Sequence, residues 1–477
     1  MPARGPRADH RPVPPIPPAQ DDPHGWAASA PSGPDPEAPP TWGTDPLAPR
    51  ASTEPLEPPA PPKPGIRNAV AAFRYRNFSL FWTGALLSSS GNWMQAISIP
   101  FVVFEITQSA AWVGFAAVMQ FAPVAIVGPI GGTLADRYDR RTVLLATQTA
   151  QALAAFSLWF VWASGVRSMA VILGIVALNG LIAGLNIPSW QAFVSELVPR
   201  EHLLNAVTLN SAQFNAARAF GPALGGLVLG FLGVGWAFFL NGVSFLAVIG
   251  ALLLISVPKL AKAVGERRQG IVAGFVESAR YSARRPGIWV CLVVVVALGG
   301  LGSPMNQLFA VFADDVYGVG DVAYGLLAAA AGTGAVLGTP LIVGPGSRLA
   351  RSRLTNIAML AYGLAVVAFG FISIYGLGLV ALLVTGAGYL ALASTLNTTI
   401  QLQVDEIMRG KVIALYVMCL TVALPIGALL QGVFAQFVGP QIAVMVFGTL
   451  FLAVWGWLRF GGGDHLAAMD ADPPIVR

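Results

Sequence analysis

Long apolar runs separated by short polar connections follow one another from residue 78 to residue 460. Each run reaches the length of about 20 residues that an α-helix needs to cross the hydrocarbon core of a bilayer. Several connections are so short that the helices beside them must be antiparallel. The pattern predicts twelve transmembrane helices, over residues 78–104, 111–133, 142–164, 168–194, 203–232, 235–257, 287–313, 321–344, 354–375, 377–402, 412–436 and 440–460.

A longer connection, residues 258–286, divides this region into halves of similar size, 67–257 and 287–461. The halves look like a weak parallel repeat, because two arginines after the second run recur at the same spacing after the eighth. The acid before the first pair has no counterpart in the second half. We therefore expect an all-α integral membrane protein with two pseudo-symmetric six-helix halves.

The connection between the halves has a helical pattern of its own. Apolar residues recur at helical spacing from Ile271 to Ala279, and Arg280, Arg284 and Arg285 follow. Such a segment is typical of an amphipathic helix on the inner leaflet, where basic residues meet anionic headgroups. A solvated linker helix is the alternative.

The chain is polar at both ends. Residues 1–66 hold 21 of the 36 prolines and no long apolar run, so they cannot bury enough apolar surface to offset the entropy of ordering. We expect a disordered, Pro-rich cytoplasmic tail here, either inert or partner-binding. Residues 462–477 are expected to form a second cytoplasmic tail.

Composition and charge agree with a membrane protein. Hydrophobic residues make up 55% of the chain and charged residues 11%, against about 25% charged residues in soluble domains. With twelve helices, 26 of the 28 Lys and Arg residues lie on one side, while Arg167 lies on the other and Arg218 within a helix. Because basic loops stay in the cytoplasm, both termini are expected there. The net charge of +5 is spread over short loops, which argues against nucleic-acid binding.

The sequence offers little for catalysis or for a bound cofactor. Cys291 and Cys419 lie in apolar runs and the four histidines lie outside them, so neither a disulfide framework nor a metal site is expected. No glycine-rich loop ends in Lys-Ser or Lys-Thr, which argues against an ATP-driven pump. We expect no enzymatic activity, no metal and no cofactor.

The connection between the second and third runs is very short and strongly charged. In chain order it contains Gly132, Asp136, Arg137, Arg140 and Arg141. This spacing resembles the loop between helices 2 and 3 of the major facilitator superfamily, with Asp139 in place of a second glycine. The resemblance implies a solute transporter with a central site between its halves.

We expect this loop to act as a gate latch. Asp136 should face the N-terminal end of the eleventh helix, near Lys411 and Val412, where free amides and the helix dipole favour an anion. Arg140 should reach Glu196 at the end of the fourth helix. A loop that only fixes the topology is the alternative.

The fifth run carries a Gly-Pro pair, two residues and a Gly-Gly pair: Gly221, Pro222, Gly225 and Gly226. Small residues let a neighbouring helix approach closely, and proline bends the helix. The motif resembles that of the proton-coupled exporters of the superfamily, and generic helix packing is the alternative.

Two further stretches, residues 73–95 and 184–200, resemble the bacterial branch that includes enterobactin and macrolide exporters. This resemblance implies a monomer in the bacterial inner membrane. It also implies a small-molecule substrate, with protons as the coupling ion.

Polar side chains inside the membrane are candidates for the transport pathway. The candidates are Asn92, Gln95, Asn186, Asn215, Arg218, Asn306, Gln307 and Asn397. Most fall on runs that line the central cavity in the family, which suggests an amphipathic pocket. Hydrogen bonds that merely link helices are the alternative.

Arg218 lies near the middle of the fifth run and should face the protein interior. Its expected partners are amide oxygens such as those of Asn92 or Gln95, backbone carbonyls near Pro222, or an acidic group of the substrate. A purely structural arginine is the alternative. No Asp or Glu lies in the middle of a run, so a single deep carboxylate that carries the proton is not supported.

These observations favour secondary active export of a small hydrophobic or amphipathic compound, such as a drug, antibiotic or siderophore. Import of a nutrient or facilitated uniport by the same fold is one alternative. A lipid-handling or non-transport membrane scaffold is another.

Overall fold

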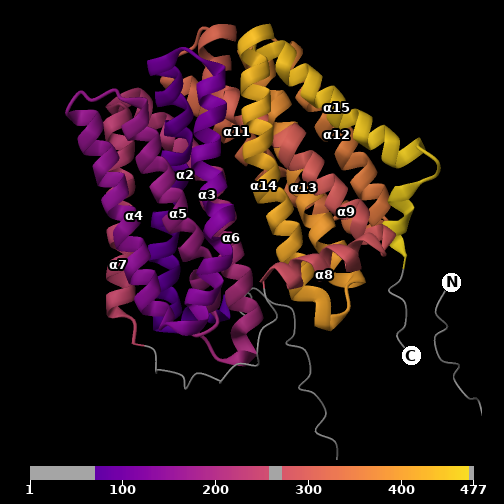
Figure 1. The fold of residues 1–477 in the computed structure, drawn as a ribbon, viewed down its shortest axis with the longest axis horizontal. Helices are drawn as coiled ribbons and strands as arrows, with labels where there is room; N and C mark the ends of the chain where they lie inside the picture. The colour runs from indigo at the N-terminus through magenta and orange to yellow at the C-terminus, as the bar shows by residue number, and fades with distance from the viewer. Residues whose placement is uncertain (1–69, 257–270, 472–477) are drawn as a thin grey trace, which may run out of the picture. The chain divides into compact units, whose positions relative to one another are not determined.

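The computed structural model describes residues 70–256 and 271–471, so the expected N-terminal tail and residues 472–477 lie outside the described residues. The described chain is almost entirely helical (Figure 1). A 3₁₀ turn, η1 (Ala71–Arg74), precedes the first half. The six long helices of that half are α2 (Arg76–Thr107), α3 (Ala110–Arg137), α4 (Arg140–Ala163), α5 (Met169–Val194), α6 (Leu203–Leu232) and α7 (Val234–Leu254).

The second half also consists of six long segments. The first of these, residues 286–316, is irregular and is divided into α9 (Pro286–Ala297), η3 (Leu298–Gly302), η4 (Ser303–Leu308), α10 (Phe309–Val311) and η5 (Phe312–Val316). The other five are α11 (Asp321–Val343), α12 (Arg351–Phe371), α13 (Tyr375–Gln403), α14 (Glu406–Val438) and α15 (Pro440–Phe460).

Ten of these segments are long and apolar enough to cross a membrane. Helices α2 and α6 are the other two long segments, with 32 and 30 residues. The prediction of an all-helical membrane fold is confirmed, and two sets of six long segments are consistent with the predicted twelve helices. The bounds of α6 and α15 match the predicted runs.

The two halves repeat the same helix contacts. In the first half α3 packs on α5 and α4 on α7, and in the second half α11 packs on α13 and α12 on α15. The repeat extends to single residues. Gly233, between α6 and α7, has φ +85°, and Gly439, between α14 and α15, has φ +87°. Each makes a one-residue reversal in a left-handed conformation that a side chain would strain.

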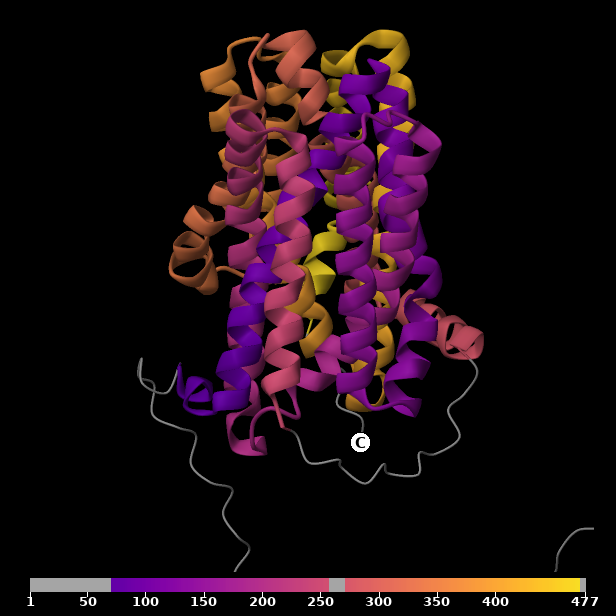
Figure 2. The ribbon, with the colours of Figure 1, turned by 90° about the vertical axis from the view of Figure 1, so that its left-hand side faces the viewer.

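Two lines of contact join the halves. Helix α6 packs on α11, and α3 packs on α14; we call these the α6–α11 seam and the α3–α14 seam. Figure 2 shows the first half from the side, with its helices running between the two ends of the bundle. We call the end that carries the charged connection after Arg137 the basic end, and the other the opposite end.

Two short elements lie at the basic end of the second half. Helix α8 (Ile271–Ala283) forms where the sequence predicts an amphipathic helix, and it contacts α9 and α14. A 3₁₀ helix, η7 (His465–Asp470), follows α15 and packs on α9 and α12. Leu466 and Met469 of η7 are fully buried, so this part of the expected C-terminal tail is a packed element.

Candidate functional site

The charged connection after α3 ties three helix ends of the first half together. Arg140 donates a hydrogen bond to Glu196 beyond the end of α5, with 2.5 Å from Nη1 to Oε1, as the sequence suggests. The Arg141 guanidinium donates to the carbonyls of Leu252 and Leu253 at 2.7 and 3.1 Å. These carbonyls end α7 and lack partners within the helix, so a cation is favourable there.

Asp139 explains how this connection turns without a second glycine. Its backbone is extended, with φ −61° and ψ 122°, and its carboxylate accepts hydrogen bonds from the Thr142 amide and hydroxyl at 2.9 and 2.8 Å. It is therefore the N-cap of α4. The close approach to α5 is made at Gly131, where an added Cβ would lie 2.5 Å from the Gly184 carbonyl oxygen, while Gly132 has open space around it.

Asp136 is exposed in the last turn of α3, and Arg137 ends that helix. Lys411 of α14 forms an ion pair with Glu277 of α8 at 2.7 Å. The expected contact of Asp136 with Lys411 and Val412 stays a prediction.

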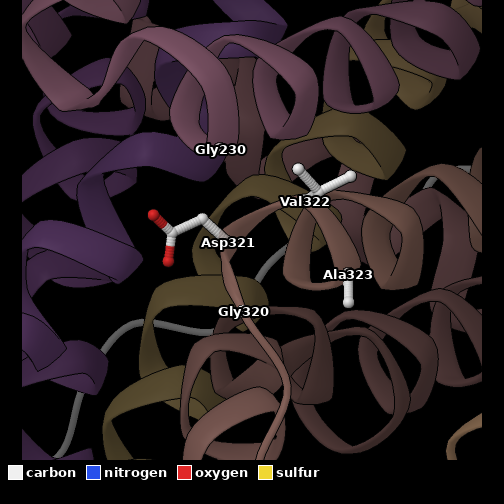
Figure 3. Close-up of a pocket in the computed structure, with 5 residues that line it drawn as sticks. All are labelled: Gly230, Gly320, Asp321, Val322 and Ala323. Carbon is white, nitrogen blue, oxygen red and sulfur yellow. The ribbon is translucent and has the colours of Figure 1, made fainter.

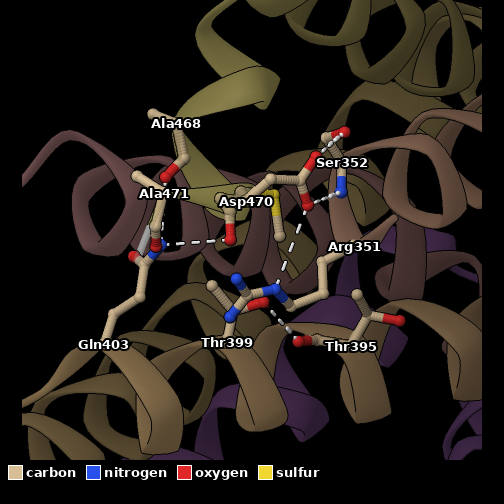
Figure 4. Close-up of polar contacts among 9 residues, drawn as sticks. Arg351, Ser352, Thr395, Thr399, Gln403, Ala468, Asp470 and Ala471 are labelled. Carbon is tan, nitrogen blue, oxygen red and sulfur yellow. Dashed lines mark hydrogen bonds and ion pairs between the residues drawn. The ribbon is translucent and has the colours of Figure 1, made fainter. Parts of the chain in front are cut away.

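The matching connection of the second half is held by the C-terminal segment (Figure 4). Arg351 Nε lies 3.9 Å from Asp470 Oδ1, and the Ser352 amide donates to the same carboxylate oxygen at 3.1 Å. Gln403 at the end of α13 donates to the carbonyls of Ala468, Met469 and Ala471. Asp470 thus gives Arg351 the acidic partner that Glu196 gives Arg140.

Helix α8 and the residues that follow it are held to the end of α13 by an acidic residue. Asp405, just after α13, accepts hydrogen bonds from Arg285 and Tyr281 at 2.7 and 2.8 Å. Burial of the Tyr281 phenol raises its pKa above the ordinary value. Phe275 and Val276 remain exposed on α8 beside Arg280.

The Gly-Pro motif of α6 lies on two helix contacts. Added Cβ atoms at Gly221 and Gly225 would lie 2.5 Å from Trp93 Cβ and 2.9 Å from Ile97 Cδ1, so these glycines let α6 approach α2. An added Cβ at Gly226 would lie 2.2 Å from the Cα of Gly325 in α11. Gly226 therefore forms part of the α6–α11 seam.

The same seam continues to the opposite end. Gly230 of α6 meets Val322, and both residues line a depression of about 430 Å³ together with Asp321 (Figure 3). Close by, the Tyr324 hydroxyl donates to the Ile97 carbonyl at 2.5 Å. On the α3–α14 seam, Ser109 donates to Gln436 at 2.8 Å. These contacts hold the halves together at the opposite end.

The irregular first segment of the second half lies where the halves meet. Its 3₁₀ part, η4, contacts α2 and α3 and carries Asn306, which is exposed, and Gln307, whose buried oxygen has no hydrogen-bond partner among the described residues. Broken helices with unwound backbone often form solute sites in transporters.

Arg218 lies midway along α6, at the level of two rings from different halves. Its guanidinium carbon is 4.3 Å from the ring centre of Tyr389, midway along α13, and 5.8 Å from that of Trp93 in α2. Phe214 packs edge-on to Trp93, with 6.0 Å between centres. The guanidinium therefore lies between the two halves.

Other predicted pathway amides have different neighbours. Gln95 is buried and accepts a hydrogen bond from Asn241 of α7 at 2.8 Å. Among the described residues Arg218 makes no hydrogen bond to Gln95, so the expectation that Gln95 accepts from Arg218 is wrong. Asn186 accepts from Thr147 at 2.8 Å and so links α5 to α4.

The remaining amides stay closer to water or to their own helix. Asn215 is exposed and donates to the Ser211 carbonyl one turn earlier. Asn397 is half-buried and accepts from Gln401, and Asn92 is half-buried on α2. These side chains are polar groups on α2, α6 and α13, the helices that also carry Trp93, Arg218 and Tyr389.

Three residues of the site were missed by the sequence reasoning. Tyr389 and Gly325 lie in runs rich in small and apolar residues, where nothing marks one position above another. Asp470 lies in a short polar tail with a weak apolar pattern. Only the pairing of distant helices distinguishes these positions.

A comparison with protein families agrees with this geometry. The model of the family described as transmembrane secretion effector matches residues 67–461. The chain belongs to this family, an exporter branch of the major facilitator superfamily. It is therefore a membrane transporter.

Curated relatives share most of their length with the chain. An uncharacterized MFS-type transporter, YfiS of Bacillus subtilis, is 26% identical over 77% of this chain and 89% of its own. Macrolide efflux protein A of Streptococcus pyogenes is 22% identical over 80% and 96%. Enterobactin exporter EntS of Shigella dysenteriae is 27% identical over 75% and 85%.

Solved structures share the fold. The nucleoside transporter NupG has a TM-score of 0.65 and 12% identity, and covers 83% of this chain and all of its own. A bacterial homologue of the human lysosomal transporter Spinster, in an inward-facing and unoccupied conformation, has a TM-score of 0.63 and 16% identity over 84% and 99%.

Proposed function

We propose that the chain is a secondary active exporter of a small hydrophobic or amphipathic compound, which it moves by alternating access. The observation that carries this proposal is Arg218, a charge placed midway through the membrane between two rings from different halves. A central site between rocking halves is the arrangement that alternating access requires. The names of the macrolide and enterobactin relatives support export as the direction.

The contacts between the halves support an inward-facing state. The Gly226–Gly325, Gly230–Val322 and Ser109–Gln436 contacts lie along the seams toward the opposite end. We propose that the basic end faces the cytoplasm, with both termini, because basic residues dominate its connections. The seams then close the outer side of the inner membrane.

In this scheme the outward-facing state closes the basic end through the charged connection after α3. Arg140 and Arg141 already fix this connection to α5 and α7, so it can move as one body with the first half. Asp136 at its tip would then meet the start of α14, where helix amides favour an anion. Asp136→Asn keeps the size, removes the charge and should slow transport.

Proton coupling is part of the proposal. Asp321, an exposed carboxylate, lines the depression at the end of the α6–α11 seam (Figure 3), so protons can reach it from the opposite end. Protons moving inward would drive the substrate outward.

The test compares deletion and overexpression strains across a panel of antibiotics, siderophores and other amphipathic compounds. Export predicts that deletion raises sensitivity to or retention of one class, that overexpression lowers it, and that a protonophore abolishes the difference. Asp136→Asn, confirmed to be inserted at wild-type levels, should export more slowly than wild type and fall between wild type and the deletion. Lower uptake of a nutrient on deletion would favour import, and no change for any compound would favour a scaffold.

A further inference from the structure

Arg218 differs in its surroundings from three arginines near the basic end. Arg140, Arg285 and Arg351 each face a carboxylate. Within the described ranges, Arg218 has no ion pair and no hydrogen bond, and its guanidinium lies against the Tyr389 and Trp93 rings.

A guanidinium in this position needs an acceptor. Arginine stays protonated and carries five N–H donors, and an unpaired arginine at the bilayer centre is unfavourable by about 2.5–3.5 kcal/mol on insertion scales. Ring faces stabilise the cation but accept none of those hydrogen bonds in the way an anion does. The Arg218 guanidinium is therefore placed to bind an anion, because the described chain supplies no counter-ion for it.

The rings around Arg218 also indicate what kind of molecule would carry this anionic group. Gly221 lets α6 approach α2, with no room for a side chain beside Trp93, and Phe214 adds a further ring on the same side. Tyr389 supplies a ring from the second half. An anion at the guanidinium would thus have aromatic surfaces from both halves beside it.

We propose that Arg218 binds the anionic group of an amphipathic organic anion whose apolar body stacks on Trp93 and Tyr389. This assignment of substrate class rests on the proposed exporter function. The bound molecule touches both halves at mid-membrane, so it is positioned to be carried when the halves rock. A bidentate carboxylate fits the planar fork of the guanidinium best.

The test measures binding of two fluorescent probes that differ only in charge, 1-pyrenebutyrate and 1-pyrenebutanamide. Purified full-length protein in phosphatidylcholine nanodiscs is titrated by fluorescence anisotropy, with empty nanodiscs subtracted. Wild-type protein should bind the carboxylate about 10- to 100-fold more tightly, the range expected for hydrogen bonds to a charged group. Adding phosphatidylglycerol, an anionic lipid, to the nanodiscs should leave this preference unchanged. If the site instead binds anionic lipid, phosphatidylglycerol should compete with the carboxylate probe and abolish its binding.

Two variants test whether Arg218 causes the preference for the carboxylate probe. Arg218→Gln should bind both probes with the affinity that wild type shows for the amide. Arg167→Gln is the matched control, because Arg167 stacks 3.6 Å from the Trp162 ring centre but lies in a connection at the opposite end. A charge preference that survives in Arg218→Gln, or an absent preference in wild type, would overturn the proposal.

The outcome is separable from that of the proposed function. Selective carboxylate binding that Arg218→Gln abolishes, in a protein that exports nothing from the panel, would refute export and leave the site intact. Export of neutral or cationic compounds alone, without carboxylate binding, would refute the site and leave export intact.

Discussion

At the scale of single residues, Tyr281 offers a contact whose strength depends on pH. Its hydroxyl donates to the Asp405 carboxylate at 2.8 Å, and burial raises the pKa of the phenol. A group whose pKa is raised by folding contributes stability below its unfolded pKa of about 10 and loses it as the pH rises through the folded value.

Tyr281→Phe should therefore lower the free energy of unfolding by about 1 kcal/mol, the usual net value of one hydrogen bond. The difference in Tm from wild type should be constant between about pH 6 and 9 and shrink above about pH 10. Thermal unfolding in detergent at several pH values measures it. A difference that grows above pH 10 would contradict this reading.

Single residues also show where sequence reasoning succeeds and where it stops. The Arg140–Glu196 pair could be expected because both lie at helix ends that the predicted topology places on the same side. The contacts of Gln95 could not, because two buried amides compete for partners and only the packing of α2 on α7 selects Asn241. For Arg218, the sequence predicted an interior position but not the two rings beside it.

At the scale of elements, the α6–α11 seam depends on glycine. An added Cβ at Gly226 would meet the Gly325 backbone at 2.2 Å, so Gly226→Ala must separate α6 from α11. The cost of such overpacking is about 1–3 kcal/mol, and it falls on the state in which the seam is closed. Gly226→Ala should therefore populate the outward-facing state and slow transport several-fold.

The rate at which a maleimide labels a cysteine at Ser109, at the opposite end of the α3–α14 seam, measures this shift. Labelling should be faster in Gly226→Ala and unchanged in the matched variant Gly250→Ala, since no atom lies near an added Cβ at Gly250. Equal labelling rates in all three proteins would show that Gly226 does not control the seam.

The C-terminal element is expected to stabilise the second half. Leu466 and Met469 of η7 are buried, and Gln403 donates to two carbonyls of η7 and to that of Ala471 just after it. Deleting residues 465–477 should lower the Tm by several degrees because buried apolar side chains are lost, whereas deleting residues 472–477 should leave it unchanged. An unchanged Tm for the longer deletion would mean that η7 is dispensable.

Helix positions were predicted more closely than helix partners. The apolar runs locate the long helices because the bilayer fixes their length, and α6 and α15 match within a residue. The break in residues 286–316 was not predicted, although its sequence carries the signals: Gly299, Gly300 and Gly302 weaken the helix, and Pro304 lacks the N–H that a regular helix needs. The η7 helix was missed because six residues give too short a pattern.

At the scale of the whole molecule, the central claim is that the halves must separate along their seams during transport. The most direct measurement uses Ser109→Cys with Gln436→Cys, whose native side chains meet across the α3–α14 seam at 2.8 Å. Cys291 and Cys419 are first replaced by alanine. Proton-driven accumulation of the exported compound is then followed in inside-out vesicles. After cross-linking with a short bis-methanethiosulfonate reagent, accumulation should stop, and dithiothreitol should restore it, while each single-cysteine protein should be unaffected. Full accumulation by completely cross-linked protein would contradict alternating access between the two halves.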